Sequence, residues 1–281
     1  MSITSVYLLP DEGEQIRLDL RDPNAQSQFI VRNIVGIDAD EIVPRFYGFS
    51  KDGLKRFYDL RLPQREIVIR VVLNPRYNTG EDISYLRNII YKTISSTRSG
   101  EIGVEFRDGA SVHSRVYGHI IKLEVAHFSN VPELQLTVRC NDPMFRSISS
   151  VLLGSDELSF SNPVIIGDSS STAPHGFSMK VTFTDTTPDF TIQNSVTDPE
   201  WDFKVVPSTD FLSGDELYFS SEFNNRYLYM VRSSVTTHLL DRIEPTSVWP
   251  IIFPGINQFY FPDVASFTWD YIRFYSAFWG L

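Results

Sequence analysis

The sequence predicts a mainly β chain of two domains: an N-terminal β-sheet or barrel with one helix, then a C-terminal β-sandwich. Apolar and polar residues alternate in many short runs, and only one stretch has helical spacing. The charge also changes near the middle of the 281 residues. Residues 1–146 contain 19 basic and 19 acidic residues, whereas residues 147–281 contain 6 and 16, a net charge of −10. We therefore expect domains 1–145 and 146–281.

The helical stretch lies in the first half, at 81–95. Its apolar residues recur three or four positions apart, as one buried helix face requires: Ile83, Leu86, Ile89, Ile90 and Ile94. Thr79 and Asp82 resemble a capping box at its start, and the serines from Ser95 onwards predict its end.

Strand patterns surround this helix. Apolar residues alternate in the runs 67–73, 102–106 and 134–140. In the long run 112–126 the apolar phase changes from even to odd positions, which predicts a bulge near Gly118. We expect the second part of that run to pair with 134–140, and Asp142-Pro143 to end the first domain.

The second half contains almost no helical periodicity. Short alternating runs are separated by Pro, Gly, Asn and Asp clusters at about 10- to 15-residue intervals, the pattern of a β-sandwich. The serine-rich stretch 169–172 is predicted to be a mobile loop. The C-terminal run 271–281 is too apolar for a loose tail, so we expect it to dock in the sandwich or on a neighbouring chain.

Composition excludes several classes of function. An acidic second half argues against sequence-specific nucleic-acid binding, which needs a cationic surface. No window is apolar enough for a transmembrane helix, and no ordinary secretory signal is present. Cys140, the single cysteine, lies on the apolar phase of its strand and is predicted to be core. No nucleophile elbow, zinc-protease, phosphate-loop or dinucleotide motif occurs, so we expect neither an enzyme nor a cofactor.

Two groups of residues are candidate binding sites. His113, His119 and His127 cannot share a metal ion on one straight strand, because six strand residues span roughly 20 Å. No metal site is therefore expected. The aromatic residues of the second half are predicted to be core or interface, with sugar stacking as the alternative. Trp201 and Trp269 are the candidates for that stacking.

Several pieces of the chain, taken in order, resemble the distal tail proteins of long-tailed bacteriophages. The pieces span nearly the whole chain: Arg61-Leu62-Pro63 with Arg65-Glu66-Ile67, the helix at 81–95, Phe128-Ser129-Asn130, Pro132-Glu133, Gln135-Leu136, Cys140, Asp142-Pro143-x-Phe145 and Phe253-Pro254-Gly255-x-Asn257. The resemblance implies an N-terminal domain that forms a ring of six copies, and a galectin-like, jelly-roll sandwich that points outward.

The resemblance further implies a structural protein of the virion tail tip, assembled in the host cytoplasm. Its expected partners are five further copies of itself, the tail tube protein, the baseplate hub or tail-associated protein, and other tail-tip or receptor-binding proteins. We expect the ring surface to include the helix face and the region 57–65, which is rich in Arg and Tyr. The candidate residues are Tyr58, Arg61, Arg65, Tyr85, Asn88, Tyr91 and Lys92. The alternative function is a carbohydrate-binding adhesion module that recognises host cell-surface glycans.

Overall fold

The computed structural model describes residues 3–10, 14–20, 27–38, 43–49, 55–61, 64–95, 100–125, 132–155, 162–194, 202–223 and 225–281, with the backbone alone for 43–49, 55–61, Tyr77, Ser95 and Asn194. The chain divides into two compact units, Met1–Ile148 with Trp279–Leu281, and Ser149–Phe278. The predicted fold class is confirmed: the chain is mainly β, with one α-helix among the described residues. The last three residues belong to the first unit, whereas the sequence placed them in the second domain.

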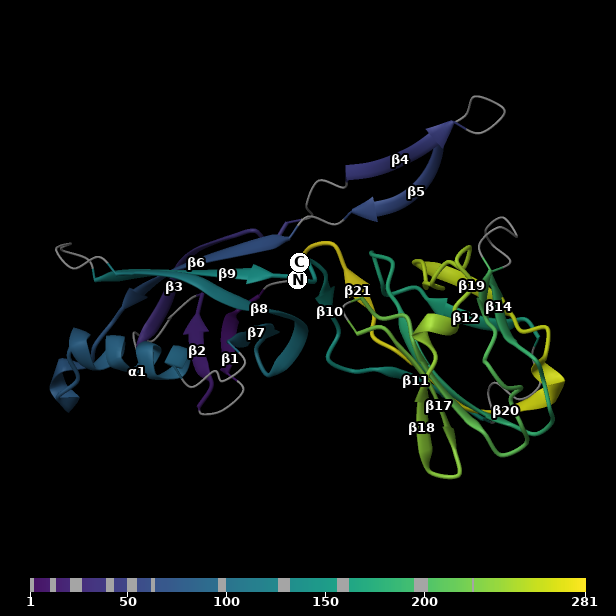
Figure 1. Ribbon diagram of the computed structural model, residues 1–281. Coiled ribbons are helices and arrows are strands. Elements are labelled where there is room, and N and C mark those ends of the chain that lie inside the picture. The colour runs from purple at the N-terminus through teal and green to yellow at the C-terminus, as the bar shows by residue number, and fades with distance from the viewer. Residues whose placement is uncertain are drawn as a thin grey trace. The chain divides into compact units, whose positions relative to one another are not determined.

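Seven strands of the first unit close into a barrel (Figure 1). Their order is β8-β7-β1-β2-β3-β6-β9, and β9 pairs again with β8. Their bounds are β1 Ser5–Pro10, β2 Ile16–Asp19, β3 Phe29–Val35, β6 Arg65–Leu73, β7 Glu101–Asp108, β8 Ser111–Val125 and β9 Glu133–Cys140. The short β10, Phe145–Arg146, adds to β8. Each barrel strand has a described neighbour on both sides, although β2 and β3 pair only at Asp19 and Ile30.

The barrel interior follows from the alternation in the sequence. Residues at every second position of β6 and β9 are buried, among them Ile67, Ile69, Leu136 and Val138. Cys140 is buried on the same phase, as predicted. The expected pairing of β8 with β9 is confirmed, with Val125 opposite Leu134.

The register shift of β8 lies three residues beyond its predicted place. Ile120 is opposite Val138 and Lys122 is opposite Thr137, so Ile121 is the extra residue. Gly118 has a different role, because a β-carbon there would lie 2.6 Å from the Arg139 carbonyl oxygen. The glycine allows β8 and β9 to approach each other.

We expect Gly118→Ala to lower the free energy of unfolding of the barrel unit by about 1–3 kcal/mol, since backbone must move to admit the methyl group. Gly167→Ala is the matched control in a strand of the second unit, where a β-carbon meets nothing within 4 Å. Urea unfolding of the full chain with hydrogen exchange of each unit would measure both. Equal stability of the two variants would contradict this account of Gly118.

The helix of the first unit is α1, Ile83–Ser95, preceded by the 3-10 turn η1, Tyr77–Thr79. Asp82 caps it, since its Oδ1 accepts a hydrogen bond from the Tyr85 amide at 2.6 Å. The predicted capping box is therefore wrong in one member, because the Thr79 hydroxyl donates to the Arg76 carbonyl instead. Leu86 and Ile90 are buried, as the helical spacing predicts.

The first unit also contains a hairpin, β4 Val43–Phe49 and β5 Lys55–Arg61. These strands form a separate two-stranded sheet and pair with no other described strand. We call this element the β4–β5 hairpin.

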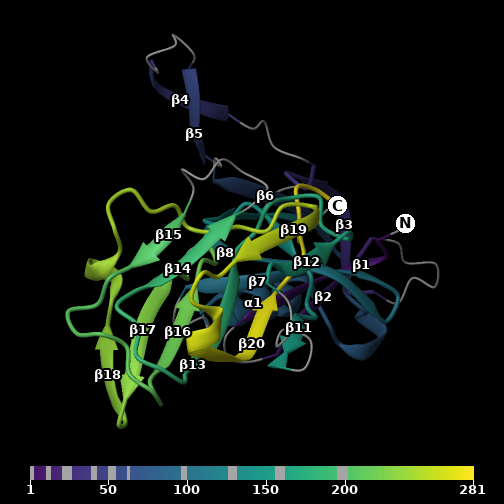
Figure 2. The ribbon, with the colours of Figure 1, turned by 90° about the vertical axis from the view of Figure 1, so that its right-hand side faces the viewer.

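The second unit is a sandwich of two antiparallel sheets (Figure 2). The larger has the order β11 Val151–Gly154, β20 Phe267–Phe274, β13 Phe177–Phe183, β16 Glu216–Ser220, β17 Tyr227–Arg232 and β18 Val235–His238. The smaller has the order β12 Val164–Asp168, β19 Gly255–Tyr260, β14 Phe190–Asn194 and β15 Phe203–Val205. Three short elements complete this unit: η3 Leu240–Arg242 after β18, η4 Val264–Ser266 before β20, and β21 Ala277–Phe278 after β20.

Phenylalanine dominates the core between these sheets. The Phe183 ring stacks on Phe211 at a centroid distance of 4.3 Å, and Phe177 contacts both Phe219 and Phe259 at about 5.5 Å. Burying each such side chain contributes about 1.5–3 kcal/mol. Most of the described phenylalanines in this half are thus core.

Candidate functional site

Arg65, the first residue of β6, is buried, with 1% of its surface exposed. Its guanidinium donates to backbone carbonyls of three separate segments: Gly36 and Asp38 at 2.8 and 2.7 Å, Pro143 at 2.5 Å and Trp279 at 2.5 Å. A guanidinium has five N–H donors in a rigid plane, so one side chain can hold several carbonyls at once. Arg65 therefore ties these segments together at the end of the barrel.

The segments that Arg65 joins are the loop after β3, the turn at Asp142-Pro143 and the C-terminal end of the chain. The Leu281 amide also donates to the Ile37 carbonyl at 3.1 Å, which adds a second bond between the C-terminus and the same loop. Asp142 accepts from the Met144 amide and from Arg146 at 2.7 Å, and so shapes the turn that presents Pro143. Asp142-Pro143 thus forms a turn that hydrogen bonds hold to the barrel.

Helix α1 presents an exposed polar and aromatic face. Tyr85 and Tyr91 are 51% and 43% exposed, and Asn88 and Lys92 are also exposed. Spacings of three, six and seven residues from Tyr85 place the four side chains on one side of the helix. The opposite side, with Leu86, is buried. The structure thus brings together four of the seven predicted ring-surface residues.

The other three predicted ring-surface residues belong to β5 and β6, not to helix α1. The backbones of Tyr58 and Arg61 lie in β5, and their side chains lie outside the described residues. Arg65 cannot present its charge to another subunit, because its guanidinium is buried among carbonyls of its own chain. Its assignment to the ring surface is corrected accordingly: Arg65 is an internal anchor.

Trp269, a sequence candidate for sugar stacking, is 5% exposed in the sandwich core. Phe261 and Phe267 contact its ring edge-to-face at 4.7 and 5.2 Å. A buried ring offers no free face to a sugar, so this assignment is also corrected. Its indole Nε1 has no hydrogen-bond partner among the described residues. Trp201, the second candidate, lies outside them.

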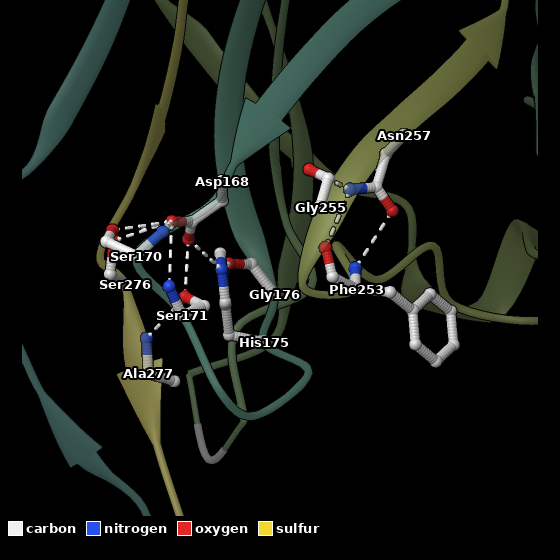
Figure 3. Close-up of polar contacts among 10 residues, drawn as sticks. All are labelled: Asp168, Ser170, Ser171, His175, Gly176, Phe253, Gly255, Asn257, Ser276 and Ala277. Atoms are coloured by element: carbon white, nitrogen blue, oxygen red, sulfur yellow. Dashed lines mark hydrogen bonds and ion pairs between the residues drawn. The ribbon is translucent and has the colours of Figure 1, made fainter.

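The sandwich contains a buried polar cluster around Asp168, the last residue of β12 (Figure 3). The carboxylate accepts bonds from the Ser170 and Ser171 amides and hydroxyls, from His175 Nε2 at 2.8 Å and from the Ser276 hydroxyl at 3.0 Å. The predicted mobile loop 169–172 is therefore bonded to a buried carboxylate, and Ser171 itself is 6% exposed.

The electrostatics of this cluster favour an ionised carboxylate. Burial alone raises the pKa of Asp168, but hydrogen bonds from Ser171, Ser170 and His175 outweigh it and hold the pKa below the ordinary value of 3.8. His175 uses both ring nitrogens, since Nδ1 faces the Gly176 carbonyl at 3.1 Å and Nε2 faces Asp168. No described serine hydroxyl contacts the imidazole, so the cluster lacks the nucleophile–base pair of acyl-transfer enzymes.

A second polar contact shapes the entry of β19 (Figure 3). The Asn257 side chain accepts from the Phe253 amide at 2.9 Å and donates to the Phe253 carbonyl at 2.8 Å. Gly255 has a φ of +103°, a conformation that favours glycine. The sequence piece Phe253-Pro254-Gly255-x-Asn257 thus forms a closed turn bonded by its own asparagine.

The described residues contain no group of three or more His, Cys, Asp or Glu side chains placed to hold a metal ion. Likewise, no helix among them is long and apolar enough to cross a membrane.

The closed barrel with one helix, followed by a two-sheet sandwich, defines the class: this chain has the fold of bacteriophage distal tail proteins. One solved structure with this fold is the Dit protein of phage SPP1, described as a paradigm of the hub adsorption apparatus in phages that infect Gram-positive bacteria. It aligns over 97% of this chain and 99% of its own, with a TM-score of 0.60 and 14% identity.

Two structures of the phage p2 baseplate in its activated conformation, with Sr and with Ca, match more loosely. Their TM-scores are 0.45 and 0.48, at 7% and 6% identity, over 97% of this chain and 99% and 97% of their own. No family model and no curated protein sequence matches the chain.

Proposed function

We propose that this chain is a structural protein of a phage tail tip. The observation that supports this most is the likeness to the SPP1 Dit protein, which extends over both units and nearly the full length of both chains. On this proposal the protein belongs to the virion and is assembled in the host cytoplasm. It joins the tail tube protein to the baseplate hub and helps host attachment together with other tail-tip or receptor-binding proteins.

We further propose that six copies form a ring through their barrel units. A head-to-tail interface repeated until the rotation closes produces such a ring. The balanced charge of residues 1–146, 19 basic against 19 acidic, suits close contact between like subunits. The net charge of −10 in residues 147–281 suits a solvent-facing sandwich, for which a galectin-like jelly roll remains our prediction.

The exposed face of α1 is the candidate ring surface in the first unit. Tyrosine is enriched at the centres of protein interfaces, and Tyr85 and Tyr91 are both exposed to solvent in the single chain. Asn88 and Lys92 add hydrogen-bond donors beside them. An interface with this composition can bury aromatic area and still satisfy its polar rim.

We expect the double variant Tyr85→Glu/Tyr91→Glu to lose the ring without loss of folding. Each new carboxylate would be buried at the contact, and an unpaired buried charge costs several kcal/mol. Folding should persist because both side chains are exposed in the single chain. Negative-stain electron microscopy and sedimentation velocity would measure ring formation.

The matched control is Leu212→Glu/Ile256→Glu, which adds the same charge at exposed residues of the second unit, 43% and 72% exposed. This control should keep the ring. A wild-type protein that remains monomeric at high concentration, with no six-fold rings in micrographs, would overturn the proposed ring.

A further inference from the structure

The β4–β5 hairpin pairs with no other described strand of its own chain. An isolated two-stranded hairpin is marginally stable in water, because it buries little apolar surface. Its two strands nevertheless contain five aromatic residues: Phe46, Tyr47, Phe49, Phe57 and Tyr58. A hairpin with this composition, and with no partner among the other described strands, would gain stability from a partner strand in another chain.

The two edges of the hairpin differ in their ability to pair. Pro44 lies in β4 and has no N–H, so that strand lacks one backbone donor. β5 contains no proline and therefore offers a complete set of backbone donors and acceptors. The hairpin strands contain four basic residues and one acidic residue, a net charge of +3: Arg45, Lys55, Arg56, Arg61 and Asp59.

The root of the hairpin is held by the anchor described above. Gly36 and Asp38 precede β4, and Arg65 follows β5 by four residues. The Arg65 guanidinium donates to both carbonyls, so the two ends of the hairpin segment meet at one buried side chain. A fixed root lowers the entropy that the hairpin loses when it binds a partner.

A complementary free edge exists in the second unit, at β18. This strand pairs with β17 on one side and with no described strand on the other, and all four of its residues are exposed. Ser233 and Ser234 form the two-residue turn before it, with φ values of 47° and 66°. In such a hairpin the residues next to the turn, Arg232 and Val235, form backbone hydrogen bonds with each other across the strands. Backbone direction alternates along a strand, so Thr236 and His238 direct their N–H and C=O groups to the free edge.

A cavity of about 390 Å³ adjoins this edge. Its lining includes Val235 and Thr237 from β18, the buried Met230 and Leu239, and Pro207 from the facing loop. Because side chains alternate along a strand, every second residue of an added strand would point toward the side of Val235 and Thr237.

We propose that β5 of one copy adds as a strand to the free edge of β18 in a second copy. The charges are complementary, since the hairpin strands have a net charge of +3 and residues 147–281 have a net charge of −10. Backbone hydrogen bonds between the two strand edges would provide the pairing. This inference rests on the proposed self-assembly and names one contact within it.

Cysteine cross-linking between two differently labelled chains tests the contact. Phe57→Cys in one preparation is mixed with Thr236→Cys in another, under mild oxidation, so that only two different chains can join the two sites. The native Cys140 is buried and leaves the background low. We expect the mixed disulfide to form at least about tenfold faster than in the control mixture with Ile256→Cys, because pairing raises the effective concentration.

The variant Thr236→Pro supplies a second measurement. It removes one N–H that faces the free edge and leaves the bonds to β17 intact, so the sandwich should fold. In this measurement the second cysteine is His238→Cys, and we expect the Phe57→Cys chain to cross-link to it about tenfold faster than to Ile256→Cys. Adding Thr236→Pro to the His238→Cys chain should abolish that difference in rate.

The outcomes separate this inference from the ring proposal. Rings without the Phe57–Thr236 cross-link would overturn the β5–β18 contact and leave the ring standing. Fast cross-linking without rings would support the contact and overturn the ring. Absence of both would overturn both. A Thr236→Pro chain that cross-links as fast as its parent would also count against strand addition.

Discussion

The variant Arg65→Ala is expected to lose about 3–5 kcal/mol of unfolding free energy in the barrel unit. The substitution removes a buried guanidinium and leaves the carbonyls of Gly36, Asp38, Pro143 and Trp279 without its hydrogen bonds. It also removes the cation above the Phe145 ring, 4.7 Å from the centroid. Arg65→Lys should recover only part of this loss, because one ammonium cannot reproduce the planar set of donors.

Arg139→Ala is the matched control for Arg65→Ala. Arg139 also belongs to the barrel, but its side chain is 45% exposed and pairs with Glu66 at the surface, so its loss should change stability by about 1 kcal/mol or less. Urea unfolding with hydrogen exchange of the barrel amides would measure the variants. An Arg65→Lys protein as stable as wild type would contradict the role of the guanidinium fork.

The variant Asp168→Ala should lower the unfolding free energy of the sandwich unit by about 3–5 kcal/mol. It leaves the Ser170 and Ser171 amides, His175 and the Ser276 hydroxyl without their shared acceptor in a buried place. Asp270→Ala is the control, since that side chain is 36% exposed and 3.7 Å from Lys180. Thermal unfolding of both variants would check the difference.

The same carboxylate makes the sandwich acid-sensitive. The pKa of Asp168 in the folded chain lies below its ordinary value of 3.8, so its contribution to stability is fully present above that pH. The contribution is lost as the pH falls through the folded value. The pKa of Asp215 is also lowered, because bonds from Arg232 and the Leu212 amide outweigh its burial. Asp168→Ala should therefore flatten the loss of stability below pH 3.8, and an unchanged pH profile would contradict this.

Periodicity predicted the strands and the helix, because each depends on a short stretch of chain. The alternation at 134–140 and the helical spacing at 81–95 each describe one face of one element, and the structure confirms β9 and α1 at those places. The bulge in β8 was predicted within three residues of Ile121. A phase change shows that an extra residue exists, whereas its location depends on the pairing with β9.

Periodicity did not predict the burial of two charged residues, Arg65 and Asp168. Arg65 lies on the apolar phase of β6 with Ile67 and Ile69, and Asp168 lies on the apolar phase of β12 with Ile166. A charge on the apolar phase of a strand is a signal that could have marked both residues as buried. The Arg- and Tyr-rich composition of its neighbours instead favours a ring surface, which the burial of Arg65 contradicts.

The sequence by itself determined the strand and helix periods, the buried Cys140 and the difference in charge between the halves, because these are properties of short segments or of composition. Tertiary structure alone decided that Arg65 holds the Trp279 carbonyl, 214 residues away, and that Asp168 holds Ser276, 108 residues away. It also decided that Trp269 is core and that one edge of β18 pairs with no described strand. The physical reason is that burial and hydrogen-bond partners depend on which distant segments the closed barrel and the two packed sheets bring together.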